Sequence, residues 1–204
     1  MTSQPKRLII AVDCDDVLVL TTPFLVDAYN KTYGTHATLA EAPDASAAAW
    51  MDEPDVVIKQ WAALCETYDY KLLGPDPEEA IILRELAKHH ELHLITARKP
   101  EERTFTQQML ERELKGVFTS MEFVGLTGSK GEVCKRIHAD VLIDDNASHL
   151  HDAIENGMAK SGAILFGDYP WNEADNSHEN LTHCYDWNAV KKVIDELALN
   201  DRPN

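Results

Sequence analysis

The stretch "AVDCDDVLV", residues 11–19, places three carboxylates at the end of the first apolar run of the chain, at Asp13, Asp15 and Asp16. Packing does not explain them, because an aspartate is rarely buried unless another group compensates its charge. Carboxylates this close together also favour one another's protonated form. The stretch therefore predicts a strand that ends at a site where a positive group from solution balances the carboxylates.

The rest of the chain has the pattern of an α/β protein. Short apolar runs alternate with segments of helical periodicity over 204 residues, which predicts a mainly parallel sheet with helices on both faces. We expect strands at 8–13, 92–96, 121–124, 141–144, 162–166 and 182–185, and helices at 77–89, 100–114, 130–138, 147–156 and 187–197. The predicted fold is a Rossmann-like, three-layer α/β core.

Residues 21–76 interrupt this alternation, because they carry helical signals and no convincing strand. The pair Thr22-Pro23 begins one helix that Gly34 ends, and a second helix is expected over residues 55–70. Connections of this length are usually functional. We therefore expect an α/β core made of residues 1–20 and 77–204, with a small helical cap inserted at 21–76.

Composition and charge exclude several classes of partner. The formal net charge of −16 disfavours non-specific binding of nucleic acid, which needs Lys and Arg to neutralise phosphates. The start MTSQPKR has no signal-peptide pattern, and no run approaches the roughly 18 apolar residues of a membrane span. The four cysteines form no C-x-x-C pair. We expect a cytoplasmic protein without nucleic-acid or membrane partners, and the oligomeric state stays open.

The ends of the other expected strands also carry polar groups. Thr96 ends one strand and is followed by Arg98, "LIDDN" supplies Asp144 and Asp145, and "TGSKGEV" places Lys130 at the start of a helix. Ligands of parallel sheets bind beyond the carboxyl ends of the strands. Clustered carboxylates suit Mg²⁺, which prefers hard oxygen ligands, while threonine, lysine and free backbone N–H groups hold phosphate oxygens. The sequence thus predicts a magnesium site that handles phosphate.

Each of these features alone has a simpler explanation. A carboxylate pair after a strand more often forms a turn or a helix N-cap than a metal site, and Lys130 alone is an ordinary solvated helix residue. The combination carries the prediction, because four separate segments bring complementary groups to one edge of the sheet.

The order of these groups resembles the four motifs of the haloacid dehalogenase superfamily: a strand with D-x-D-x-V, a strand ending in threonine, a lysine, and a strand with two aspartates. The insertion point matches that superfamily's first type of cap. Within the superfamily, "VDCDDVL", "LITAR", "GSK", "LIDDN" and "ILFGDYPWN" look like the 5′(3′)-deoxyribonucleotidase (type C nucleotidase) branch.

This resemblance implies a role for each matched residue. Asp13 would be the nucleophile that attacks phosphorus, and Asp15 would be the general acid and then the general base. The phosphoryl group would be bound by Thr96, Ala97, Arg98 and Lys130. The Mg²⁺ cofactor would be held by Asp13, the backbone carbonyl of Asp15, Asp144 and Asp145.

Asp16 departs from the pattern, because members of the superfamily often carry glycine at this position. We expect its side chain to point away from the phosphate and to cap the following segment. The alternative is that Asp16 tightens metal binding.

The function predicted on these grounds is hydrolysis of a small phosphorylated metabolite, with a nucleoside monophosphate as the first class, through an aspartyl phosphate. Phe24 is the candidate for contact with a base, and Arg98, Lys99 and Lys130 are expected to form a positive rim. A sugar phosphate or another small phosphoester is the enzymatic alternative. A phospho-accepting signalling domain and a catalytically silent binding protein are the non-enzymatic ones.

Overall fold

Six parallel strands form a single sheet in this computed structural model, which describes residues 5–172 and 181–200. The strand order is β3-β2-β1-β4-β5-β6. The strands are β1 Ile9–Val12, β2 Glu91–Thr96, β3 Phe118–Phe123, β4 Val141–Asp144, β5 Ala163–Phe166 and β6 Thr182–Cys184. The expected parallel sheet is confirmed. Strand β3 begins earlier than expected because a register shift lets Phe118 pair with Leu92 of β2.

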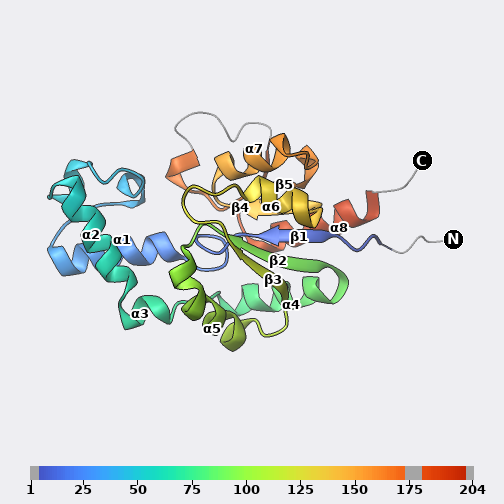
Figure 1. The fold of residues 1–204 in the computed structure, drawn as a ribbon, viewed down its shortest axis with the longest axis horizontal. Helices are drawn as coiled ribbons and strands as arrows, with labels where there is room; N and C mark the ends of the chain where they lie inside the picture. The colour runs from blue at the N-terminus through green and yellow to red at the C-terminus, as the bar shows by residue number, and fades with distance from the viewer. Residues whose placement is uncertain (1–4, 173–180, 201–204) are drawn as a thin grey trace.

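Helices cover both faces of the sheet, which makes the three expected layers (Figure 1). One face packs against α4 Pro77–His89, α5 Arg103–Glu113 and α8 Trp187–Asn200, and the other against α6 Lys130–Ile137 and α7 Ala147–Glu155. Side chains alternate between the two faces along β1, because successive residues of a strand point to opposite sides. Ile10 and Val12 accordingly join the first core, and Ala11 joins the second.

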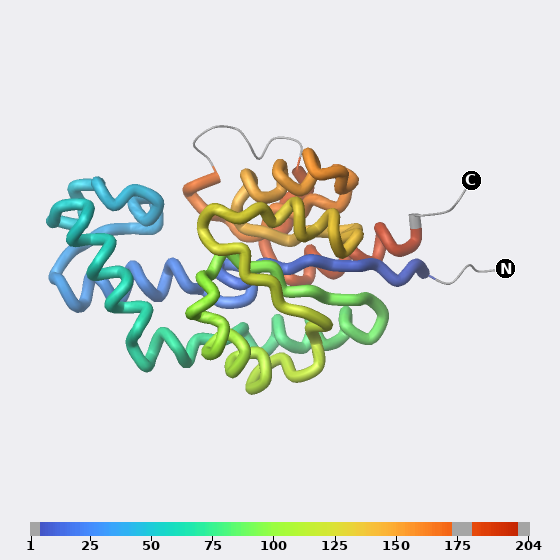
Figure 2. Tube along the Cα trace, viewed as in Figure 1, coloured from blue at the N-terminus to red at the C-terminus, as the bar shows by residue number. Residues whose placement is uncertain are grey.

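Residues 21–76, here called the helical insertion, contain no strand and form a hydrophobic cluster of their own. The insertion comprises α1 Thr21–Tyr33, α2 Pro54–Cys65 and α3 Tyr68–Lys71, with 3₁₀ turns at Leu39–Glu41 and Ala48–Trp50. Figure 2 shows these helices beyond the carboxyl end of β1. The expectation of one helix over 55–70 is wrong, because Thr67 adopts extended backbone and its side chain caps α3 at the N–H of Tyr70.

The strand order places the polar strand ends side by side. Strands β2 and β3 lie on one side of β1, and β4, β5 and β6 lie on the other. The order in which the chain adds strands to the sheet therefore reverses between β1 and β4. In open α/β sheets, ligands bind at the carboxyl ends of the strands beside such a point. None of the helices in the described ranges is long and apolar enough to cross a membrane.

Candidate active site

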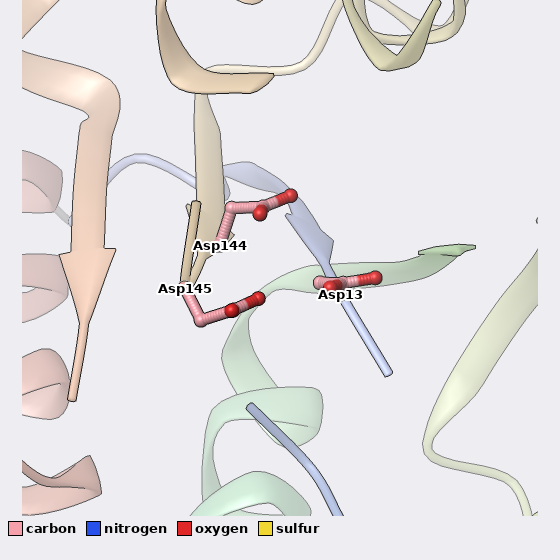
Figure 3. A group of neighbouring side chains, drawn as sticks. All are labelled: Asp13, Asp144 and Asp145. Carbon is pink, nitrogen blue, oxygen red and sulfur yellow. The ribbon is translucent and has the colours of Figure 1, made fainter. Parts of the chain in front are cut away.

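Three carboxylates meet at the carboxyl edge of β1 and β4. Asp13 follows β1, Asp144 ends β4 and Asp145 follows it, and each offers an oxygen within 4.8 Å of the others (Figure 3). The parallel register fixes this meeting, because Val12 pairs with Ile143 and the N–H of Asp13 donates to the carbonyl of Ile143 at 3.0 Å. The structure therefore brings together the predicted acidic cluster.

Lys130 lies between two of these carboxylates. Its Nζ is 2.8 Å from Asp13 Oδ1 and 2.7 Å from Asp144 Oδ2, and the residue is fully buried. Burial disfavours the charged ammonium, but the attraction of Asp13 and Asp144 outweighs it and holds the pKa of Lys130 above its ordinary value. The expectation that Lys130 belongs to a positive rim is therefore wrong, because its charge is buried and is balanced by Asp13 and Asp144.

The start of α6 and a carboxylate of α7 hold Lys130 in this place. Ser129 caps α6 by accepting the N–H of Glu132 at 2.8 Å, and Asp152 of α7 accepts both the Ser129 hydroxyl and the N–H of Gly131 at 2.8 Å. A Cβ at Gly131 would lie 2.4 Å from the carbonyl oxygen of Asp152. The S-x-x-E spacing of Ser129 and Glu132 signals the helix start in the sequence, whereas the roles of Gly131 and Asp152 were not predicted.

The cluster carries more negative charge than Lys130 balances. Burial raises the pKa of Asp13 to about 7, against the attraction of Lys130 and with the help of Asp144. Burial, followed by the charges of Asp144 and Asp13, also raises the pKa of Asp145 well above its usual range. Lys130 Nζ lies 2.8 Å from the buried Asp13 Oδ1, and no other donor among residues 5–172 and 181–200 forms a hydrogen bond to this oxygen. Hard carboxylate oxygens with an unsatisfied lone pair fit a Mg²⁺ ion.

We expect the stability of the metal-free protein to fall as the pH rises from about 4 to about 7. The pKa of Asp13 rises from its ordinary value of 3.8 to about 7 in the fold, so over this range the folded chain holds a proton that the unfolded chain has lost. The free energy of unfolding then decreases with pH. Thermal melting in EDTA across this range measures the effect, and Asp13→Asn should make the fall shallower. An equally steep fall in that variant would contradict the raised pKa.

Asp15 is held by an arginine. Arg98 Nε lies 2.9 Å from Asp15 Oδ2 and Nη2 lies 2.6 Å from Oδ1, and the hydroxyl of Thr21 also donates to Oδ1. Burial alone would raise the pKa of Asp15, but the Arg98 guanidinium outweighs it and lowers the pKa. Arg98 is 7 % exposed, so of the three cations expected at the rim only Lys99 is exposed. The structure thus directs Arg98 at Asp15.

The turn after β2 lies next to this pair. Thr96 is fully buried at the end of β2, and its Oγ1 accepts the N–H of Arg98 at 3.1 Å. Ala97 is half-buried between them. Because β2 pairs with β1, this turn and the turn that carries Asp13 share one edge of the sheet. The predicted phosphate-binding positions Thr96 and Ala97 therefore lie at the same edge as the carboxylates.

Asp16 caps the helical insertion, as expected. Its Oδ1 accepts the N–H of Thr22 at 2.9 Å and its Oδ2 accepts the Thr22 hydroxyl, near the start of α1. Its backbone carbonyl accepts the Tyr169 hydroxyl at 2.9 Å. The backbone of Asp16 has φ of 58°, a left-handed conformation that glycine adopts freely and aspartate tolerates. This backbone conformation explains why glycine suits the position.

We expect Asp16→Ala to lower the free energy of unfolding by about 1–2 kcal/mol, the usual cost of losing a helix cap. Asp16→Gly loses the same two bonds to Thr22 but removes the cost of a left-handed backbone, so it should be less destabilising by about 1 kcal/mol. Urea denaturation of both variants measures the difference. A glycine variant less stable than the alanine variant would contradict this role.

The loop after β5 binds Asp145. Trp171 Nε1 donates to Asp145 Oδ2 at 3.0 Å, and Asn172 Nδ2 donates to the Asp145 carbonyl at 2.6 Å. The rings of Trp171 and Tyr169 stack with centroids 4.4 Å apart, which connects this contact to Asp16. The stretch "ILFGDYPWN" contains these residues, but the contacts of Tyr169 and Asn172 were not predicted, because a single sequence carries no signal for contacts between strand-end loops.

Comparison with known proteins shows the fold. No protein-family model matches the chain, and no curated protein sequence matches it. A haloacid dehalogenase-like hydrolase from Streptococcus pneumoniae aligns over 90 % of this chain and 96 % of its own, with 13 % identity and a TM-score of 0.63. A predicted phosphoglycolate phosphatase from Haemophilus somnus aligns over 92 % and 97 %, with 13 % identity and a TM-score of 0.61.

A third solved structure, a HAD family hydrolase from Deinococcus radiodurans with bound phosphate and sodium, aligns over 96 % of this chain and 98 % of its own, with 14 % identity and a TM-score of 0.61. At this level of identity the likeness concerns the fold. The chain therefore has the fold of haloacid dehalogenase-like hydrolases.

Proposed function

We propose that this protein is a Mg²⁺-dependent phosphomonoesterase that hydrolyses a small phosphorylated metabolite through an aspartyl phosphate. The observation that carries the proposal is the buried contact of Lys130 with Asp13 and Asp144, beside Asp145 and two residues from Asp15. In this proposal Asp15 serves the other side of a phosphoryl group held at Asp13. The phosphatase and the phosphate-bound hydrolase among the structural neighbours support the proposal.

Asp13 is the nucleophile in this proposal. Its carboxylate attacks phosphorus, and the repulsion between two anions is the main obstacle to the step. Lys130 has three N–H donors, and its contacts with Asp13 and Asp144 leave one for a phosphate oxygen. The Thr96 hydroxyl and the N–H of Ala97 are further donors at the same edge.

A bound Mg²⁺ supplies positive charge that offsets the repulsion between the carboxylates and the substrate phosphate. The residues that would hold it are Asp13, Asp144 and Asp145, with the backbone carbonyl of Asp15 as a further ligand. Trp171 and Asn172 hold Asp145 in place through their hydrogen bonds to it.

Asp15 is the acid and base in this proposal. A phosphate dianion bound beside it favours its protonated form, which offsets the effect of Arg98. Asp15 first gives a proton to the leaving oxygen, and then takes one from the water that releases phosphate from Asp13. Dividing the hydrolysis in this way turns one difficult step into two easier ones.

The helical insertion is a cap over this site in our proposal, and it limits the substrate to small molecules. Its aromatic residues Tyr29 and Trp50 are buried in its own core, whereas Phe24 is half-buried against Tyr70. Phe24 therefore stays the candidate for contact with a nucleobase. Nucleoside monophosphates are the first class to test, and sugar phosphates and phosphoglycolate are the second.

A phosphate-release screen with Mg²⁺ tests the proposal. It compares nucleoside monophosphates, sugar phosphates, phosphoglycolate and a phosphorylated protein. We expect turnover of at least one small monophosphate and little release from the protein. Release from the phosphoprotein alone would contradict the substrate class. Stable phosphorylation of the chain by a small phosphodonor without turnover would instead favour the signalling domain.

A further inference from the structure

Arg98 is buried just beyond the end of β2, and each of its three guanidinium nitrogens donates a hydrogen bond. Its Nε and Nη2 atoms bind the carboxylate of Asp15, and Nη1 donates to the Thr106 hydroxyl of α5 at 2.9 Å. Its Cζ lies 5.2 Å from the centroid of the Phe105 ring and 5.9 Å from that of Tyr70. A guanidinium held by a hydroxyl and two aromatic rings keeps a fixed direction.

The two oxygens of Asp15 are not equivalent in this arrangement. Oδ1 receives donors from Arg98 Nη2 at 2.6 Å, from Arg98 Nε at 3.1 Å and from the Thr21 hydroxyl. Oδ2 receives only Arg98 Nε, at 2.9 Å, among the hydrogen bonds that the described residues make to it. A carboxylate oxygen offers about two lone pairs. Oδ1 is therefore saturated, and Oδ2 keeps an acceptor site.

Part of this arrangement comes from the helical insertion. Thr21 is the first residue of α1, and Tyr70 belongs to α3, whose ring also packs against Phe105 of α5 with centroids 5.8 Å apart. Asp15 is thus oriented by Arg98 from the turn after β2, with support from α5 and from both ends of the insertion.

We propose that Arg98 is a positioning residue that fixes Asp15 so that Oδ2 is the oxygen that exchanges protons during the reaction. This inference rests on the proposed function and deepens it. Arg98 acts through Asp15 and does not bind the substrate phosphate, in contrast to the expectation from the sequence. Arg98 is 7 % exposed, and each of its three guanidinium nitrogens donates to Asp15 or to Thr106.

The proton balance of the reaction follows from this assignment. As the bond between Asp13 and phosphorus forms and the ester P–O bond breaks, the proton on Asp15 Oδ2 moves to the leaving oxygen. In the second half, Oδ2 takes a proton from water as the water oxygen bonds to phosphorus and the Asp13–phosphorus bond breaks. The products are an alcohol or phenol and inorganic phosphate, and Asp15 returns to its protonated form.

Two esters that differ in their leaving group test this role. Phenyl phosphate needs a proton on its leaving oxygen, whereas 4-nitrophenyl phosphate expels a stable phenolate. The kcat/KM value reports the steps through P–O cleavage. We expect Arg98→Met to lower kcat/KM for phenyl phosphate by about tenfold to a hundredfold, the scale of a misplaced catalytic group, and for 4-nitrophenyl phosphate by less than about threefold.

Three further variants control for folding and charge. Arg103→Met removes an exposed neighbouring cation of α5 that packs on Phe123 and, within the described part of the chain, forms no hydrogen bond or ion pair with Asp15, and it should leave both values unchanged. Arg98→Lys keeps the positive charge but lacks the planar pair of donors that binds both oxygens of Asp15. Its kcat/KM for phenyl phosphate should therefore lie between those of Arg98→Met and the wild-type protein. Thr106→Val keeps Arg98 but removes the hydrogen bond from its Nη1. It should lower kcat/KM for phenyl phosphate more than for 4-nitrophenyl phosphate, and by a smaller factor than Arg98→Met.

Binding of inorganic phosphate, measured by calorimetry with Mg²⁺, separates the two roles of Arg98. We expect the Kd of phosphate to change by less than about threefold in Arg98→Met, because the guanidinium contacts Asp15 instead. Equal losses on both esters together with weakened phosphate binding would overturn the positioning role. A wild-type protein that neither hydrolyses either ester nor binds phosphate would instead overturn the proposed function.

Discussion

Asp13→Asn is expected to remove both turnover and the phosphoenzyme, with a rate loss on the order of 10⁴-fold or more, typical of a removed nucleophile. An amide is a poor nucleophile, and it also cannot form the charged contact that Asp13 makes with Lys130. The measurement is steady-state phosphate release together with acid-quenched labelling by a radioactive substrate.

Asp15→Asn is the matched comparison, because it changes the same chemical group two residues away. We expect it to slow turnover by roughly a hundredfold or more, the usual scale for lost acid–base help. Asp15 is not in the buried contact with Lys130, so an activated ester should still phosphorylate this variant. Retained activity in Asp13→Asn with a dead Asp15→Asn would show that the nucleophile is misassigned.

Removing divalent cations is expected to abolish turnover, and Mg²⁺ is expected to restore it. The cluster brings three carboxylates together, and the single positive charge of Lys130 contacts only Asp13 and Asp144 among them. The metal-free site therefore repels an incoming phosphate. Dialysis against EDTA followed by titration with Mg²⁺, with phosphate release as the readout, measures the effect.

Ca²⁺ is the matched control for Mg²⁺, because it has the same charge but takes more ligands at longer distances. We expect Ca²⁺ to raise the melting temperature while supporting turnover poorly, since longer bonds misplace the nucleophile. Full turnover in metal-free buffer would contradict the proposed magnesium site. Equal turnover with Ca²⁺ would contradict the dependence on ligand geometry.

The sheet and the acidic cluster could be predicted because they depend on local patterns. Apolar runs of strand length define β1, β2 and β4, and their parallel order brings Asp13, Thr96 and Asp144 to one edge. The position of Lys130 was also predictable, because a helix start after a glycine-serine turn is visible in the sequence.

Contacts between distant segments could not be predicted. The pairing of Arg98 with Asp15 depends on how α5 and the helical insertion pack, through Thr106 and Tyr70, and neither residue carries a signal for this. The exposed rim expected from Arg98 and Lys130 was wrong for the same reason, because burial depends on partners that only the fold supplies.

The proposed mechanism depends most directly on where the phosphoryl group is held. Rapid acid quench of the Mg²⁺-loaded protein during turnover of a labelled small monophosphate, followed by peptide mapping, locates it. We expect a transient acyl phosphate on Asp13, formed and lost at rates that match turnover. Turnover without any phosphoenzyme, or a label on another residue, would contradict catalysis through Asp13.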